Sequence, residues 1–412
     1  MKRSIVRRRL AFSAVVMGLM LFAVCSSATP LDDYVAAPDP SYSYGPEPIT
    51  TYSGTGYTAT MWPMTSQTWR SAEEVDRTEW EHQLTIIVPA EVSHTKAMLF
   101  ISGGSNNGHI PPSPPSHLTF IATETQSIVA ELRQIPNQRI KFADETDPRY
   151  IENGRAEDEL IAYCWDKYKT TGDPLWLPRL PMTKAVVRAM DTVQSEYPSI
   201  EEFVVSGASK RGWTTWTTAL VESRIEAIIP LVIDVLNVEH SMQHHWDAYG
   251  YWADAIHDYV DMNIMDWLHS PEFRDMMDII DPYQYADNRL TMPKYIVNST
   301  GDQFFLPDSS QFYFDALKGE KYLRYVPNTD HGLEDEAVNN VAAYYEAILN
   351  GTPRPEFTWS KQPDGSLRVE TTTAPSEVRL WQATNPDERN FRKDTIGEAY
   401  TSSVLTDQGG GV

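Results

Sequence analysis

Residues 203–213 read FVVSGASKRGW, and this stretch decides the fold that the sequence predicts. Phe203–Ser206 is short, apolar and β-branched, as in a strand buried on both faces. Gly207 and Ser209 follow at once, and a helix is expected over Lys210–Val221 directly after them. A serine on a sharp turn between a buried strand and a helix is typical of a nucleophile elbow, which holds the hydroxyl above the sheet.

The two glycines of this stretch fit the same interpretation. Gly207 is a small neighbour beside a strained turn, and Gly212 allows the helix to pack close to the sheet. The second glycine comes three residues after the serine rather than two, so the motif is Gly-x-Ser-x-x-Gly. The alternative is an ordinary strand-to-helix turn with Ser209 as a helix cap.

Strand-like and helix-like segments alternate along most of the chain. This alternation predicts an α/β fold with a mostly parallel sheet covered by helices. Asp308 and Gln311 have the spacing of a capping box for the third helix named below. Further strands are expected over residues 84–88, 97–102, 127–132, 227–234, 295–298 and 322–326, and further helices over 156–169, 182–195, 309–317 and 336–349.

Two polar residues follow late strands in the order that a hydrolase requires. Asp302 and then His331 each lie just past a predicted strand. In α/β-hydrolases the acid and then the histidine follow the nucleophile along the chain. We therefore expect Ser209 as nucleophile, His331 as general base and Asp302 as the acid that orients His331. Asp308 is a rival acid, but its place before a predicted helix favours a cap.

An oxyanion hole needs backbone N–H groups aimed at the developing negative charge. Lys210, directly after the nucleophile, is one candidate donor. The loop after an early strand supplies others at Gly103, Gly104 and Ser105, where small residues allow close approach to a substrate. The side chains of Lys210 and Arg211 either bind an anionic group or are surface charges on the first turn of a helix.

Two other groups of residues carry weaker signals. His240, His244 and His245 include a pair four residues apart that suits a metal, but no third ligand matches, so neither a metal nor another cofactor is expected. Glu157-Asp158-Glu159 begins a helix, where acids are favoured by the helix dipole. The alternative for these acids is binding the amino terminus of a peptide.

The sequence divides into an α/β-hydrolase domain over residues 29–352 and a small all-β module over 353–412. An insert at about 238–290 lies between two core strands and is expected to form a helical cap over Ser209. Its aromatic residues either line a substrate pocket or form a small core of their own. The β-module has too few strands for a complete sandwich, so an incomplete module is the expectation. The cap aromatics are Trp246, Tyr249, Tyr251, Trp252, Tyr259 and Trp267.

Residues 1–28 have the features of a secretory signal peptide. A basic start is followed by an apolar run over Leu10–Val24 and by Ser26-Ser27-Ala28 at a cleavage site. A membrane anchor is the alternative, but the run is short for a bilayer. We expect a secreted or periplasmic protein. Cleavage would leave Cys164 as its one cysteine, so no internal disulfide is expected, and the apolar neighbours of Cys164 place it in the core.

Composition narrows the possible partners. The chain has 412 residues, of which 41% are hydrophobic, and a formal net charge of −23. No basic block follows the first ten residues, so nucleic-acid binding is disfavoured. No later apolar run reaches membrane length. The expected partner is a small-molecule or peptide substrate.

Four stretches carry a resemblance to a known family: Pro181-Met182-Thr183-Lys184 with Ala189-Met190-Asp191, Ser206–Trp213, Gly301–Asp308 and Pro327–Gly332. Together they resemble the PhoPQ-activated pathogenicity-related protein family. The resemblance implies an exported protein with an α/β-hydrolase fold, a Ser209–Asp302–His331 triad and a β-module that continues further. The Gly-x-Ser-x-x-Gly elbow with a basic residue after Ser209 also resembles that of glucuronoyl esterases. We expect an exported serine hydrolase acting on a peptide or ester bond, or a non-catalytic signalling protein on that scaffold.

Overall fold

The computed structural model describes residues 28–333 and 336–412, so the predicted signal sequence lies almost wholly outside the described residues. A ten-stranded sheet forms the centre, in the order β1-β3-β4-β6-β5-β7-β8-β9-β10, with β2 paired to β3. The strands are β1 Ser43–Tyr44, β2 Thr50–Gly54, β3 Tyr57–Thr68, β4 Glu79–Pro89, β5 Lys96–Ile101, β6 Val129–Leu132, β7 Glu202–Ala208, β8 Ile225–Leu231, β9 Lys294–Ser299 and β10 Lys321–Val326.

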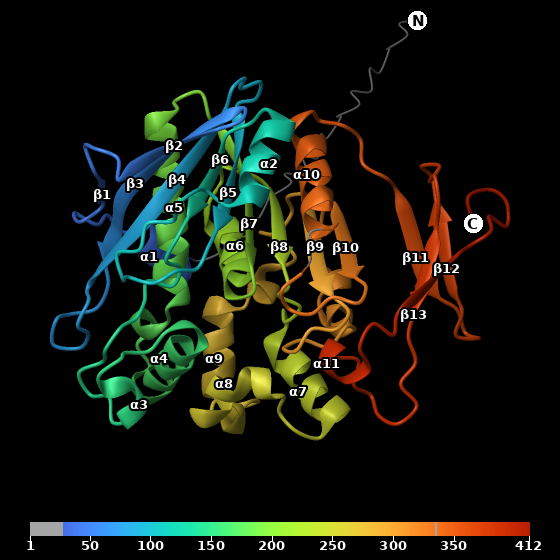
Figure 1. Ribbon diagram of the computed structural model, residues 1–412. Coiled ribbons are helices and arrows are strands. Elements are labelled where there is room, and N and C mark those ends of the chain that lie inside the picture. Colours follow the sequence, from blue (N-terminus) through green and yellow to red (C-terminus); the bar gives the residue numbers. More distant parts are fainter. Residues whose placement is uncertain (1–27, 334–335) are drawn as a thin grey trace, which may run out of the picture.

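The six strands from β6 to β10 in this order run parallel, whereas β1 to β4 pair antiparallel. Helices cover both faces of the sheet (Figure 1). On one face α1 (Pro30–Ala36), α5 (Arg179–Glu196) and α6 (Lys210–Val221) pack together, and on the other α2 (Ser116–Thr125) packs against α10 (Glu336–Leu349). The predicted α/β fold with a mostly parallel sheet is confirmed.

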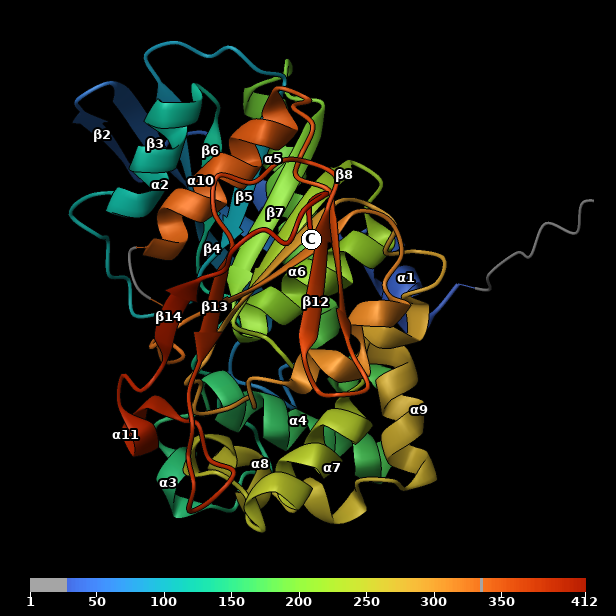
Figure 2. The same ribbon diagram turned by 90° about the vertical axis from the view of Figure 1, so that its right-hand side faces the viewer.

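Further helices gather at one end of the sheet in both views (Figures 1 and 2). α7, α8 and α9 all lie in the chain between β8 and β9, where the sequence predicts an insert. The apolar face of α9, with Phe273, Met276 and Ile280 buried, explains why this segment folds onto its neighbours. These helices are α3 Pro148–Ile151, α4 Glu157–Thr171, α7 Val238–Tyr249, α8 His257–Asp261 and α9 Pro271–Ile280.

The helix expected over residues 309–317 is wrong. Two short 3-10 turns, η5 (Ser309–Phe312) and η6 (Phe314–Ala316), take its place. Tyr313, between them, turns inward, and its hydroxyl donates to the buried Asp234 at 2.6 Å. The predicted cap is also absent, because the Asp308 side chain makes no capping hydrogen bond.

The C-terminal region forms two separate antiparallel hairpins. β11 (Phe357–Lys361) pairs with β12 (Leu367–Thr371), and β13 (Arg379–Gln382) pairs with β14 (Thr401–Val404). The short helix α11 (Lys393–Ile396) lies between the strands of the second hairpin. Figure 1 shows β11 and β12 set to one side of the central sheet. None of the helices in the described ranges is both long and apolar enough to cross a membrane.

Candidate active site

Ser209 lies at the junction of β7 and α6 in a strained conformation. Its φ of 58° and ψ of −127° are unfavourable for a residue with a side chain. The backbone holds it there, since Ser209 N donates to Leu231 O at 2.9 Å and Trp213 N donates to Ser209 O at 3.0 Å. The Ser209 side chain makes no capping hydrogen bond. The ordinary helix cap considered as the alternative is therefore not what the structure contains.

The predicted roles of the two glycines are confirmed. A Cβ atom at Gly207 would lie 2.8 Å from the carbonyl oxygen of Arg211. A Cβ atom at Gly212 would lie 2.9 Å from the carbonyl oxygens of Gly207 and Leu231. Only glycine allows β7, the turn and α6 to approach this closely.

Asp302 and His331 meet at the carboxyl ends of β9 and β10. His331 Nδ1 lies 2.8 Å from Asp302 Oδ2. The other carboxylate oxygen of Asp302 accepts from the backbone N–H groups of Phe304, at 2.8 Å, and Phe305, at 3.4 Å. His331 is held from its backbone as well, because its N–H donates to Gln303 Oε1 at 3.0 Å. Both side chains of the pair are thus fixed in orientation.

Asp308, the rival acid, contacts a different histidine. Its carboxylate lies 2.9 Å from His244 Nε2 and also pairs with Arg389. Of the two acids weighed from the sequence, it is Asp302 that contacts His331.

A cavity lies beside Ser209, beneath the helices that follow β8. Its volume is about 60 Å³. Its wall is mainly apolar, with three charged residues, Asp158, Arg179 and Lys210. Of the six cap aromatics, Tyr259 is in the wall; the other five do not belong to the described lining. The lining includes Ser209, Trp165, Trp213, Ile233, Val235, Val238, Met242, Ile256, Tyr259, Ile264, Met265, Phe273, Phe304 and Phe305.

The side chains of Lys210 and Arg211 are not surface charges, since they are only 11% and 13% exposed. Lys210 Nζ lies 2.9 Å from Glu157 Oε2 and 2.8 Å from Asp158 Oδ2. Arg211 Nη2 lies 2.6 Å from Glu157 Oε1. Burial alone would raise the pKa of Glu157, but the charges of Arg211 and Lys210 lower it to about 2.

These ion pairs answer two questions that the sequence left open. Lys210 and Arg211 already have carboxylate partners within the protein. Glu157 and Asp158 likewise have their cations, and Glu159 accepts from Ala156 N at 3.1 Å and pairs with Arg139. The three acids at the start of α4 are therefore engaged inside the protein, which removes the argument for binding a peptide amino terminus.

The glycine loop after β5 lies next to the elbow. A Cβ atom at Gly103 would lie 2.6 Å from Arg211 Nη2, and Gly104 has a φ of +130°. Gly103, Gly104 and Ser105 do not line the cavity in the described part of the chain. The first turn of α6, starting at Lys210, carries N–H groups without intrahelical acceptors. The glycine loop lies against the side chain of Arg211, two residues after Ser209.

The three cap histidines have separate partners. His240 contacts Asn237 at 2.9 Å, His244 contacts Asp308, and His245 accepts from Ala253 N at 3.1 Å. Within residues 28–333 and 336–412, no group of three or more His, Cys, Asp or Glu side chains is arranged to hold a metal ion. Cys164 is buried, as the sequence predicts.

Sequence reasoning missed Arg179, which lies in the cavity wall and is only 3% exposed. An arginine between Leu177 and Leu180, within an apolar stretch, was the available signal. Phe304 was also missed, although its ring lies 4.3 Å from that of His331, measured between centroids, and joins the histidine to the cavity wall.

Known proteins provide a further comparison. The chain is 39% identical over 403 residues to autocrine proliferation repressor protein A of Dictyostelium discoideum, covering 92% of this chain and 79% of that protein. Acetyl xylan esterase 1 from Thermoanaerobacterium sp. JW/SL YS485 superposes with a TM-score of 0.54 at 13% identity, covering 77% of this chain and 93% of the esterase.

An acetyl xylan esterase from Paenibacillus sp. R4 gives a TM-score of 0.55 at 14% identity, covering 77% and 92% of the two chains. At such identities the likeness shows a shared α/β-hydrolase fold. The PhoPQ-activated pathogenicity-related protein family matches residues 31–392. With this match over most of its length, the chain belongs to the PhoPQ-activated pathogenicity-related protein family.

Proposed function

We propose that this protein is an exported serine hydrolase that cleaves carboxylic esters. The observation that carries the proposal is the strained turn that holds Ser209 against a cavity, with a hydrogen-bonded acid and histidine on neighbouring strand ends. A strained backbone conformation costs free energy, and strained residues are concentrated at functional sites. A serine in such a conformation at the end of a parallel strand is typical of a nucleophile.

The reaction follows from the roles of the three side chains. Ser209 Oγ attacks the ester carbonyl carbon, and His331 Nε2 accepts the hydroxyl proton because Nδ1 is occupied by Asp302. The tetrahedral intermediate collapses, the alcohol leaves with that proton, and an acyl group remains on Ser209. Water, deprotonated by His331, then releases the acid. Backbone N–H groups at the start of α6 stabilise the oxyanion.

An ester is favoured over a peptide by the pairing of charges beside the cavity. A cationic peptide terminus would need a free carboxylate, and both Glu157 and Asp158 are already paired with Lys210. The wall is otherwise mainly apolar, which suits a small acyl chain.

Hydrolysis of p-nitrophenyl butyrate, with alanine p-nitroanilide as the amide comparison, tests the proposal. The wild type should hydrolyse the ester, and Ser209→Ala should lower kcat by about 10³-fold or more. Ser206→Ala is the matched control, since Ser206 Oγ donates to Ile229 O at 2.7 Å in the buried strand. Its rate should stay within about threefold of wild type. Faster cleavage of the amide than of the ester would contradict the choice of substrate class.

A second candidate is an extracellular signal carried by the same fold, favoured by the name of the 39% identical relative. Purified wild-type protein and Ser209→Ala would be added to growing cells of the species that makes it. Growth inhibition by both proteins would assign the signal to the fold rather than to hydrolysis. Export itself is tested by sequencing the amino terminus of protein recovered outside the cytoplasm, which should begin near residue 29.

A further inference from the structure

Arg179 stands out among the charged residues around the cavity because, within residues 28–333 and 336–412, it forms no ion pair with a carboxylate. Its Nη1 donates to Lys210 O at 2.5 Å and to Thr214 Oγ1 at 3.1 Å, and its guanidinium lies over the Trp213 ring. Its Nε atom is buried without a hydrogen-bond partner. The charge of Asp158 acts on Arg179, but the carboxylate of Asp158 pairs directly with Lys210 at 2.8 Å.

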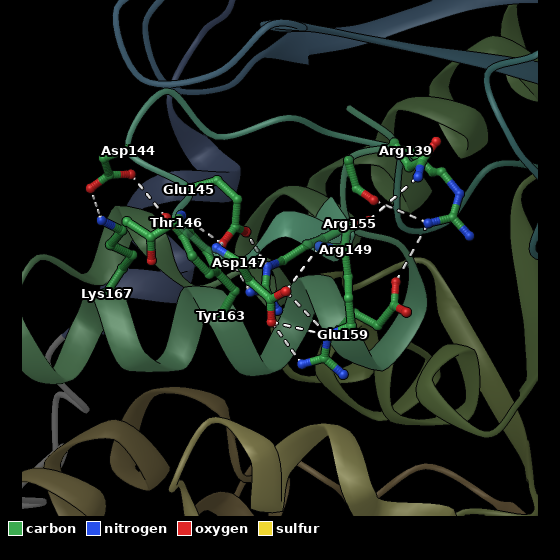
Figure 3. A network of polar contacts seen from close by, with 12 residues as sticks. Arg139, Asp144, Glu145, Thr146, Asp147, Arg149, Arg155, Glu159, Tyr163 and Lys167 are labelled. Carbon is green, nitrogen blue, oxygen red and sulfur yellow. Dashed lines mark hydrogen bonds and ion pairs between the residues drawn. The ribbon is translucent and has the colours of Figure 1, made fainter. Parts of the chain in front are cut away.

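Another buried arginine shows what a compensated charge looks like here. Arg155 is 5% exposed, and its Nε lies 2.6 Å from Glu145 Oε2, whose side chain is 4% exposed. Figure 3 shows this pair within a network of acids and arginines. Burying a charge without such a partner is costly. Arg179 is buried as deeply and lacks the acid.

The charged side chains next to the Ser209 turn include one more base than acids. Glu157 and Asp158 face the cations of Lys210 and Arg211, so two acids balance two bases. Arg179 adds a third base to the same cluster. Burial lowers the pKa of Arg179 to about 10, which still leaves it protonated at neutral pH. In the described lining of the cavity, one acid, Asp158, stands against two bases, Lys210 and Arg179, so the wall has a net positive charge.

We propose that Arg179 binds a carboxylate on the acyl group of the substrate, so that the enzyme prefers half-esters of short dicarboxylic acids. This rests on the proposed hydrolase function. Guanidinium groups bind carboxylates through charge-assisted hydrogen bonds, which are strongest where water is excluded. The cavity volume of about 60 Å³ has room for about four to six small heavy atoms, since one water needs roughly 10–15 Å³.

The test compares two esters of equal acyl length, monoethyl succinate and ethyl butyrate, by release of ethanol. The wild type should favour the succinate in kcat/KM by about tenfold or more. Arg179→Met removes the charge and should bring the two substrates within about threefold of each other, whereas Arg179→Lys should keep part of the preference. The ratio is informative even if loss of the bond to Lys210 O slows both reactions.

Arg139→Met is the matched control. Arg139 is half-exposed and pairs with Glu159 (Figure 3). It lies outside the described lining of the cavity. It should leave the ratio unchanged. An Arg179→Met ratio equal to that of wild type would overturn the carboxylate site while leaving the hydrolase intact.

A binding measurement separates the two proposals. In the Ser209→Ala background, calorimetry should give a Kd for monoethyl succinate at least about tenfold below that for ethyl butyrate, and Arg179→Met should abolish the difference. Equal affinities for both esters would refute the carboxylate site whether or not the wild type is active. Discrimination in binding, with no turnover of either ester by wild type, would support the anion site and contradict the hydrolase.

Discussion

Tryptophan side chains are mostly buried in the central sheet and its helices but exposed in the C-terminal hairpins. Trp80 in β4 and Trp216 in α6 are fully buried. Trp359 in β11 and Trp381 in β13 are 54% and 44% exposed. A two-stranded hairpin cannot bury the side chains on both of its faces, and an isolated hairpin is only marginally stable. The free energy of folding therefore resides in the central sheet and its helices.

One C-terminal segment is an exception, because it contacts the loops that carry the acid and the histidine. Lys393 N donates to Gly301 O at 3.0 Å, next to Asp302. The side chain of Asn328 exchanges two hydrogen bonds with the backbone of Tyr400, at 3.0 and 2.9 Å. The C-terminal region therefore contacts the loops of the candidate site through this segment, while the candidate site residues themselves lie at the strand ends of the central sheet.

The largest expected effect is the loss of activity in His331→Ala, at the end of a strand of the central sheet. Loss of the base should lower kcat/KM for an ester by about 10³- to 10⁴-fold with little change in Tm. His240→Ala is the control, since His240 contacts Asn237 on the cap and should keep its rate within about threefold. Steady-state kinetics of both variants check this. Full activity in His331→Ala would remove the histidine from the chemistry.

Asp302→Asn should give the next largest loss. The amide cannot stabilise the imidazolium, so kcat should fall by about 10²- to 10³-fold. Asp308→Asn breaks the contact with His244 instead and should cost less than about tenfold. If the two losses are reversed in the same kinetic assay, Asp308 is the functional acid.

The free energy of unfolding compares the two regions directly. Trp216→Ala should lower the free energy of unfolding by about 3–5 kcal/mol through the cavity it leaves. Trp359→Ala, on an exposed hairpin face, should change it by no more than about 0.5 kcal/mol. Urea denaturation of the two variants measures both. Losses of similar size would show that the hairpins carry a core of their own.

The smallest effect is a pH dependence from Asp234, which lies after β8. Burial raises its pKa to about 7, although Tyr313 donates to it. The unfolded carboxyl releases its proton near pH 4, so the folded state binds more protons between pH 4 and 7, and stability falls as pH rises through this range.

Asp234→Asn has no proton to lose, so its stability should decline less than that of wild type between pH 5 and 8. The difference should be on the order of 2 kcal/mol. Asp364→Asn, in the exposed turn between β11 and β12, should leave the wild-type decline unchanged, because the pKa of Asp364 is lowered by Ser366. Equal declines in wild type and Asp234→Asn would contradict the buried titration.

Local patterns in the sequence predicted seven strands of the sheet, β4 to β10, but missed β1, β2 and β3. They also placed three polar residues just past strands, where the structure has them. Strand residues are apolar and β-branched, and Ser209, Asp302 and His331 each follow a strand, so periodicity and order along the chain reveal them. The glycines beside Ser209 are equally local signals. The prediction of a helix over residues 309–317 was wrong because Tyr313 turns inward to Asp234, 79 residues away in sequence.

The partners of charged side chains were not predictable for the same reason. Lys210 and Glu157 are 53 positions apart, and nothing near either residue indicates that α4 and α6 bring them together. Arg179 becomes informative only when the charges around it are counted in space. Contacts between distant segments, rather than local propensity, determine whether a charge is free or paired.

The most direct test of the central claim is labelling of the folded protein with a fluorophosphonate, followed by mass spectrometry of its peptides. An activated serine reacts with this probe, whereas an ordinary one does not. We predict one phosphonylated residue, Ser209, and no labelling in Ser209→Ala. A folded wild type that stays unlabelled, or a label that persists in Ser209→Ala, would contradict the assignment of Ser209 as the nucleophile.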